Sequence, residues 1–177
     1  PAYVKNSKKP NAVMLDRIVL VKEDAVRKRS EHAKIPQVFY SENASETEKY
    51  AATEIAGYLS KISGSRISCT VEQSGKPHPS GIFVGRTAFA SVKGVDVSRF
   101  DQEEWMIRRY PEGIVISGGV PRCTLYGAYE FLERFFGIMW LDETFTHIPR
   151  QKKITLPEKI NLRSKPHFRY RGMYTWY

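Results

Sequence analysis

Two stretches of the chain space their apolar residues three and four positions apart, which predicts amphipathic helices. The first stretch follows Ser45, and Glu48 lies three residues further on, so the pair predicts an N-terminal capping box. Gly64 is expected to end this helix in a left-handed conformation. Its predicted buried stripe comprises Ala52, Ile55, Ala56, Leu59 and Ile62.

The second helix is predicted over residues 124–136, and Gly137 is expected to end it. Its predicted buried face comprises Leu125, Ala128, Tyr129, Leu132, Phe135 and Phe136. Gly127 lies inside this helix, where glycine costs about 1 kcal/mol relative to alanine. A close approach of the helix to a sheet would account for that glycine.

Short apolar or alternating runs predict strands around the helices. The predicted strands and extended segments are residues 12–22, 36–40, 67–71, 81–85, 104–109, 113–117 and 138–141. Residues 104–109 and 113–117 flank a short turn and are expected to form a hairpin, whereas residues 87–93 are weakly helical. Two helices separated by a run of strands predict an α+β fold, with a mixed β-sheet and two main helices packed chiefly on one face.

The end of the chain departs from this pattern. Residues 157–165 are polar and indicate a linker, whereas residues 166–177 are rich in aromatic side chains. Such an apolar strand at a chain end is expected to open a second domain. The sequence therefore predicts an α/β domain over residues 1–156, followed by a linker and the first strand of a truncated domain over residues 157–177.

The net charge of +9 suggests an acidic partner until its distribution is considered. Residues 1–34 carry +5, residues 35–149 carry −3, and residues 150–177 carry +7. Nucleic-acid-binding domains usually carry their basic surface on the folded core, so this distribution disfavours nucleic acid as a partner. The hydrophobic content of 41% fits a packed core.

No run approaches the roughly 18 apolar residues of a membrane helix, so no membrane partner is expected. Residues 1–10 contain neither a methionine nor the apolar core of a signal peptide, which indicates a processed or trimmed chain. Cys69 and Cys123 lack the spacing of a metal motif or a disulfide framework, so buried free thiols are expected.

Candidate chemistry is sparse. Gly118 and Gly119 precede a helix but lack the Lys-Ser/Thr of a phosphate loop, so they indicate a tight turn. Glu130 and Glu133 fit a solvated helix face. The histidines show no metal-binding spacing; they are His32, His78, His147 and His167. No catalytic residue, metal or cofactor is therefore expected in this chain.

Three motifs are more specific. The strand I-S-G-G is followed by T-L-Y-G-A-Y-E-F-L-E and then by G-I-M-W, at residues 116–140. This order resembles the N-terminal domain of alpha-glucuronidases and related multidomain glycoside hydrolases, and the resemblance covers roughly residues 45–177. It implies a hexosaminidase-like α/β domain that precedes a (β/α)8 barrel, buttresses that barrel and performs no chemistry. Large polysaccharide-degrading proteins of gut bacteria look similar.

The segment P-H-F-R-Y-R-G-M, at residues 166–173, resembles the motif that opens the catalytic barrel of beta-N-acetylhexosaminidases. The resemblance implies that Arg171 hydrogen-bonds sugar hydroxyls at the barrel mouth. His167 replaces the family's first arginine, and Thr175 or Trp176 stands where an aspartate is expected. A purely structural role for Arg171 is the alternative.

The pair Asp142-Glu143 also invites comparison with the Asp-Glu pair of hexosaminidases. It precedes the Arg-Gly strand here, whereas the family's catalytic pair follows that strand, so no catalytic role is expected.

The resemblance implies a non-catalytic N-terminal domain of a secreted or periplasmic glycoside hydrolase. Its partners would be its own C-terminal barrel and the parent's carbohydrate substrate. One alternative is an independent carbohydrate-binding module, which a row of exposed aromatic residues would favour. The other is a nucleic-acid or protein-interaction module, which the position of the charge disfavours.

Overall fold

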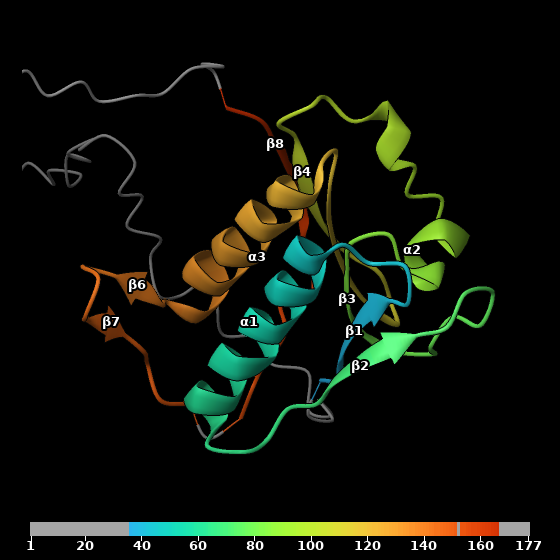
Figure 1. The fold of residues 1–177 in the computed structure, drawn as a ribbon. Coiled ribbons are helices and arrows are strands. Elements are labelled where there is room, and N and C mark those ends of the chain that lie inside the picture. Colours follow the sequence, from blue (N-terminus) through green and yellow to red (C-terminus); the bar gives the residue numbers. More distant parts are fainter. Residues whose placement is uncertain (1–35, 152, 167–177) are drawn as a thin grey trace, which may run out of the picture. The chain divides into compact units, whose positions relative to one another are not determined.

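The computed structural model describes residues 36–151 and 153–166 (Figure 1). These residues form a six-stranded sheet, a two-stranded hairpin and three α-helices. The large sheet contains β1 (Val38–Ser41), β2 (Cys69–Glu72), β3 (Gly81–Val84), β4 (Trp105–Arg109), β5 (Gly113–Gly118) and β8 (Asn161–Ser164). The hairpin is β6 (Met139–Trp140) and β7 (Thr146–His147), and the helices are α1 (Glu46–Ser63), α2 (Ala88–Val92) and α3 (Pro121–Phe136). The extended segment predicted over residues 12–22 lies outside the described residues.

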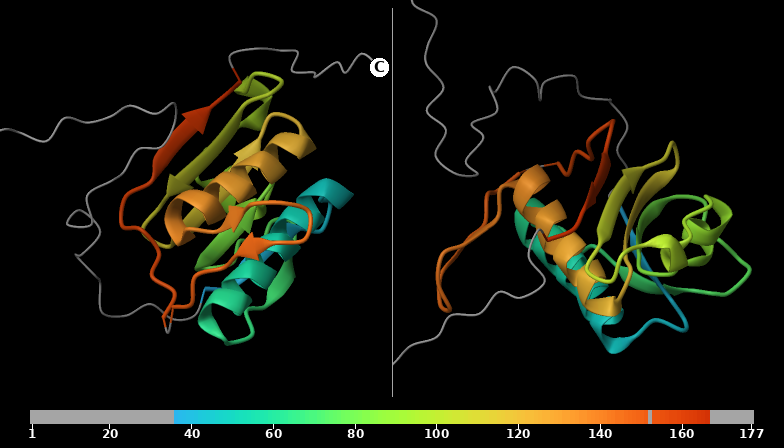
Figure 2. Two further views of the ribbon diagram at one scale, coloured as in Figure 1. Left: turned by 90° about the vertical axis from the view of Figure 1, so that its left-hand side faces the viewer. Right: turned by 90° about the horizontal axis from the view of Figure 1, so that it is seen from above.

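The strand order in the large sheet is β2-β1-β3-β5-β4-β8. β1 pairs in parallel with β2 and β3, and β3 pairs in parallel with β5. β4 runs antiparallel to both β5 and β8. The helices α1 and α3 cover one face of the sheet, and the short α2 lies on the other (Figure 2). The predicted α+β class, with a mixed sheet and its main helices on one face, is confirmed.

Both ends of α1 are as predicted. The Ser45 hydroxyl accepts a hydrogen bond from the Glu48 backbone N–H at 3.3 Å, and the Glu48 carboxylate accepts one from the Ser45 N–H at 2.9 Å. Gly64 ends the helix at φ 69°, in the left-handed region. The predicted stripe is buried, and α1 packs through it onto the sheet and α3.

The predicted buried face of α3 was partly wrong. Leu125, Tyr129 and Phe135 are only partly buried, whereas Phe131 is completely buried. The buried face of α3 is therefore turned, about the helix axis, from the predicted one. The position of Gly127 explains this difference, because a Cβ there would lie 3.2 Å from Cγ2 of Ile116 on β5. The helix therefore rests on the sheet through the side that carries Gly127, and Tyr129 is turned toward α1.

Ile67, Cys69 and Val71 alternate with polar residues, which predicts a half-buried strand with these three side chains inside, and for β2 this prediction was wrong. Val71, expected inside, is 43% exposed, and Glu72 is only 3% exposed. β2 is an edge strand, so its side chains meet fewer neighbours than those of a central strand. Glu72 is buried because its carboxylate accepts hydrogen bonds from the backbone N–H groups of His78 and Phe89, at 2.8 and 3.2 Å.

The polar stretch 157–165, which indicated a linker, contains β8. Asn161–Ser164 pairs with β4 along its length, so these residues belong to the sheet. A peripheral strand of this kind needs few apolar side chains, because one edge and much of its surface face solvent. The domain boundary predicted near residue 156 stays a prediction. Because β8 belongs to the large sheet, any such boundary would have to follow β8.

Candidate functional site

The one substrate-binding residue expected from the sequence, Arg171, lies outside the described residues. The same is true of His32, His167, Thr175 and Trp176. The role of Arg171 therefore stays a prediction.

Asp142 and Glu143 lie in the turn of the β6–β7 hairpin. One oxygen of Asp142 accepts hydrogen bonds from the backbone N–H groups of Thr144 and Phe145, both at 2.7 Å. These bonds, with one from the Thr144 hydroxyl, lower the pKa of Asp142. A general acid at neutral pH requires a raised pKa instead, so this carboxylate is suited to holding the turn.

The remaining candidates also have structural roles. Glu130 forms an ion pair with Arg134 one helical turn away, at 2.6 Å. The His78 ring stacks on Phe39 with centroids 4.0 Å apart. Within residues 36–151 and 153–166, no group of three or more His, Cys, Asp or Glu side chains is arranged to hold a metal ion.

The tight turn expected at Gly118 and Gly119 is the short connection between β5, which ends at Gly118, and α3, which begins at Pro121, and both glycines are closely packed there. A Cβ on Gly118 would lie 2.5 Å from the Cβ of Cys123, and one on Gly119 would lie 2.4 Å from the Asp101 carbonyl oxygen. Cys69 and Cys123 are both free thiols, of which Cys123 is fully buried and Cys69 partly buried. Burial raises the pKa of each, which makes them poor nucleophiles.

Aromatic side chains gather along the outer side of the helical layer. We call this set the aromatic band; it comprises Tyr50 and Tyr58 on α1, Tyr126 and Tyr129 on α3, and Trp140 on β6. The Trp140 ring meets Tyr129 and Tyr58 edge-on, with centroids 4.9 and 5.5 Å apart. The β6–β7 hairpin lies on the side of the helices away from the sheet (Figures 1 and 2). Tyr50 and Tyr126 of the band are exposed.

Polar bonds hold the band in place. The Trp140 indole N–H donates to the Tyr58 hydroxyl at 2.9 Å, and the Tyr129 hydroxyl donates to the Glu54 carboxylate at 3.0 Å. Burial and the neighbouring Glu54 carboxylate raise the pKa of Tyr129, so its phenol stays protonated and remains a donor. Hydrogen bonds therefore fix the rings of Tyr58, Tyr129 and Trp140 within the band.

The band continues into an apolar surface on the hairpin. Seven large hydrophobic side chains are exposed among the described residues, namely Tyr50, Val71, Val92, Tyr126, Met139, Leu141 and Phe145. Five of the seven belong to the band or to the hairpin and its turn. Sequence reasoning missed this surface because it assigned Tyr129 to the core and treated residues 138–141 as one more strand.

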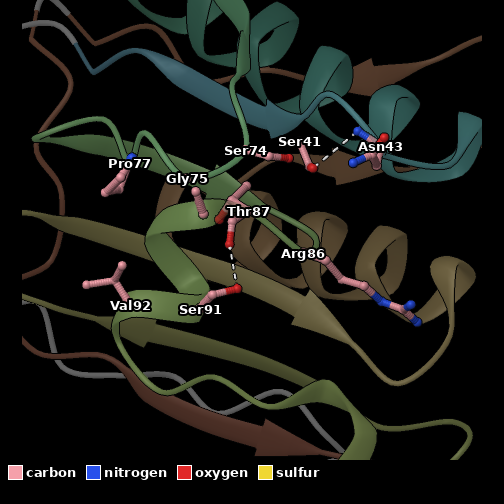
Figure 3. Close-up of a pocket in the computed structure, with 10 residues that line it drawn as sticks. Ser41, Asn43, Ser74, Gly75, Pro77, Arg86, Thr87, Ser91 and Val92 are labelled. Carbon is pink, nitrogen blue, oxygen red and sulfur yellow. Dashed lines mark hydrogen bonds between the residues drawn. The ribbon is translucent and has the colours of Figure 1, made fainter.

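A polar pocket of about 460 Å³ lies at the carboxyl ends of β1, β2 and β3 (Figure 3). Its lining is Ser41, Asn43, Ser74, Gly75, Pro77, Arg86, Thr87, Ala88, Ser91 and Val92. No motif identified these residues in advance, because they come from three loops that only the sheet brings together.

Comparison with known sequences identifies the family. Residues 21–131 match the family described as the glycosyl hydrolase family 67 N-terminus, and this range is more than half of the chain. The chain belongs to this family. The resemblance to the N-terminal domain of alpha-glucuronidase-type glycoside hydrolases is therefore confirmed.

The fold of this family 67 N-terminal domain agrees with a solved structure of a family GH115 4-O-methyl-alpha-glucuronidase with specificity for decorated arabinogalactans. The superposition has a TM-score of 0.55 and covers 76% of this chain and 18% of that chain, at 16% identity. At this identity the likeness concerns the fold alone.

A curated relative, UDP-2,3-diacylglucosamine hydrolase of Shewanella loihica, is 33% identical over 63 residues. That match covers 36% of this family 67 N-terminal domain and 26% of the hydrolase. The matched region thus spans only a minor part of the length of the alpha-glucuronidase and of the hydrolase. None of the helices between residues 36 and 166, residue 152 aside, combines the length and apolar character needed to cross a bilayer.

Proposed function

We propose that this chain is a non-catalytic N-terminal domain of a carbohydrate-active glycoside hydrolase, and that it buttresses the catalytic barrel of the same protein. The surface assigned to the barrel is the aromatic band together with the exposed apolar residues of the β6–β7 hairpin. The observation that carries the proposal is the concentration of exposed apolar side chains there. Of the seven large hydrophobic side chains that are exposed among the described residues, five lie on α1, α3 or the hairpin.

The chemistry of this surface supports a protein partner. Tyrosine, tryptophan and methionine are enriched in interface cores. The two aromatic residues bury large areas at a small cost in side-chain entropy. Met139 and Phe145 are about half exposed, at 47% and 56%, and Leu141 is 61% exposed. Contiguous apolar side chains of this kind are typical of a surface that another domain covers. The chain belongs to a family named for the N-terminus of glycosyl hydrolases, so the domain that follows it in the parent is the candidate partner.

The non-catalytic part of the proposal rests on the carboxylates. Hydrolysis of a glycoside commonly uses a pair of carboxyl groups, one of which must remain protonated. Asp142 holds a turn, Glu72 and Glu48 accept backbone hydrogen bonds, and Glu130 pairs with Arg134. These four carboxylates thus already serve the fold.

Hydroxyl-radical footprinting of side chains tests the docking surface directly. The oxidation rates of Met139, Leu141 and Phe145 are compared between this chain alone and the full-length parent. We expect these rates to fall severalfold in the parent, while that of Val92, which is 69% exposed beside α2, is unchanged. Equal labelling of the hairpin in both proteins would remove the buttressing role.

An independent carbohydrate-binding module is the second candidate, and the exposed rings of Tyr50 and Tyr126 favour it. Aromatic rings on a surface can stack on the apolar faces of sugars. Retention of the isolated chain on an insoluble polysaccharide, lost in the variants Tyr50→Ala and Tyr126→Ala, would support this function over buttressing.

The proposal also includes the parent protein. Its substrate would be a carbohydrate, its location the periplasm or the cell exterior, and residues 166–177 would begin its barrel, with Arg171 contacting sugar hydroxyls. In the parent, Arg171→Ala should then reduce kcat/KM by the equivalent of about 1.5–3 kcal/mol, the value of a lost charged hydrogen bond. Unchanged kinetics would leave Arg171 a structural residue.

A further inference from the structure

The polar pocket lies where the chain leaves two neighbouring parallel strands in opposite directions. After β1 the chain enters α1, which packs on one face of the sheet, and after β3 it enters α2, which packs on the other. β1 and β3 pair directly, from Val38↔Ile82 to Tyr40↔Val84. In open α/β sheets a divergence of this kind opens a crevice at the carboxyl ends of the strands, and ligands bind in such crevices.

Several donors in the pocket are not used by the fold. The Asn43 side-chain amide and the Arg86 guanidinium make no hydrogen bond or ion pair with any side chain or backbone group of the described residues. The Ser41 hydroxyl accepts one bond, from the N–H group of Asn43 at 3.2 Å. This hydroxyl therefore keeps a proton to donate.

Three carboxylates near the pocket accept hydrogen bonds from the fold. The Glu48 carboxylate accepts bonds from the N–H and hydroxyl of Ser45, and Glu72 accepts bonds from the N–H groups of His78 and Phe89. Glu42 is bound by the Ser74 N–H at 3.2 Å. None of these three carboxylates lines the pocket, and Arg86 is the one charged side chain among the lining residues.

We infer that this pocket binds a small ligand that carries an oxyanion, either a phosphate or a carboxylate. The Arg86 guanidinium would bind the oxyanion with two parallel N–H bonds, and Asn43 and Ser41 would donate to its other oxygens. Arg86 lies at the rim, and Figure 3 draws its side chain extended away from Ser41 and Ser74. It is exposed, and the proposed contact requires its side chain to turn toward the pocket.

This function is separate from the buttressing role, because the pocket and the aromatic band share no residue. The test is a titration of the 177-residue chain followed by the amide chemical shifts in two-dimensional NMR. The probes are inorganic phosphate, glucuronate as a sugar carrying a carboxylate, and glucose as its neutral counterpart. We expect saturable shifts at residues 41–43, 74–77 and 85–92 with phosphate or with glucuronate, and none with glucose.

Two arginine variants make the test specific. Arg86→Ala should weaken the binding about tenfold or more, as expected for a lost charge-assisted contact. Arg66→Ala is the matched control, because Arg66 is exposed and lines a shallow hollow with Gln37 and Ser68 near the amino ends of β1 and β2. It should bind as the unmodified chain does.

The probes also distinguish the source of the oxyanion. Saturation by phosphate alone identifies a phosphate-bearing ligand, and saturation by glucuronate identifies a carboxylated sugar. The inference is overturned if neither probe saturates, if glucose binds as well as glucuronate, or if Arg86→Ala binds as tightly as the unmodified chain.

Discussion

The Trp140 indole N–H donates a 2.9 Å hydrogen bond to the Tyr58 hydroxyl, and this bond ties the β6–β7 hairpin to α1 across 82 positions of sequence. The hairpin has two residues in each strand, so its own backbone bonds cannot hold it firmly. Its position over the helices therefore depends on Trp140, whose ring also contacts Tyr129.

We expect Tyr58→Phe to lower the free energy of unfolding by about 1 kcal/mol, because the partly buried indole N–H loses its acceptor. Chemical denaturation measures this change. Tyr126→Phe is the control: its hydroxyl makes no hydrogen bond to the described part of the chain, so its removal should have almost no effect. Equal stabilities of the two variants would mean that the Trp140–Tyr58 bond does not hold the hairpin.

The Arg163 guanidinium on β8 donates two hydrogen bonds, of 2.6 and 2.8 Å, to the carboxylate of Glu104, which precedes β4. This contact lowers the pKa of Glu104 below its ordinary 4.5. A carboxylate with a depressed pKa stabilises the fold above its unfolded pKa, and the contribution is lost as the pH falls through the folded value. Stability should therefore decline below about pH 4.5, partly because β8 is released.

Glu104→Gln should flatten this acid-side decline, as measured by melting temperature against pH. Glu143→Gln, on the exposed hairpin turn, keeps the same change in charge without that contact and serves as the control. If the control flattens the curve as much as Glu104→Gln, the decline reflects overall charge and not the β8 contact.

The buried carboxylate of Glu72 joins the end of β2 to α2 through its bond to the Phe89 N–H. Glu72→Gln exchanges one acceptor oxygen for a donor amide that faces a backbone N–H. We expect a loss of about 1–3 kcal/mol in the free energy of unfolding, because a buried donor is left unsatisfied. Glu42→Gln, one strand away and exposed, should cost far less. Similar losses in the two variants would contradict the structural role of Glu72.

Much of the fold follows from local signals in the sequence. Ser45 and Glu48 form the predicted capping box, and Gly64 and Gly137 end their helices at φ 69° and 71°. Such signals are complete within a few residues, so they can be recognised without knowing the tertiary structure. The family resemblance rested on similarly local motifs.

The misjudged parts depend on contacts between distant residues. The sequence around β8 does not predict that this strand pairs with β4, because a strand at the sheet edge can be polar and then lacks the apolar pattern of a strand. Tyr129 has helical spacing suited to the core, yet its hydroxyl finds Glu54 on α1, 75 positions away. The pocket combines loops after three strands, and the aromatic band combines two helices and a hairpin. Both candidate sites are therefore products of tertiary structure.

Gly85 follows β3 with φ 80°, and a Cβ there would lie 2.6 Å from the Glu48 carboxylate. Gly85→Ala should therefore cost about 1–2 kcal/mol for the left-handed backbone, and more for displacing the carboxylate from Ser45. Gly94 is the matched control, because its φ is 71° and nothing lies within 4 Å of a Cβ at that position. Gly94→Ala should show the backbone cost alone.

The two variants should differ in their loss of unfolding free energy, and this difference measures how firmly the capping box holds Glu48. A double-mutant cycle isolates the contribution of the Glu48 side chain. In the background Glu48→Ala the collision is gone, so Gly85→Ala should cost no more than Gly94→Ala does. The free energies of unfolding of all the variants come from urea titrations. If Gly85→Ala is equally costly with and without the Glu48 side chain, its effect comes from the backbone alone, and the carboxylate moves aside freely.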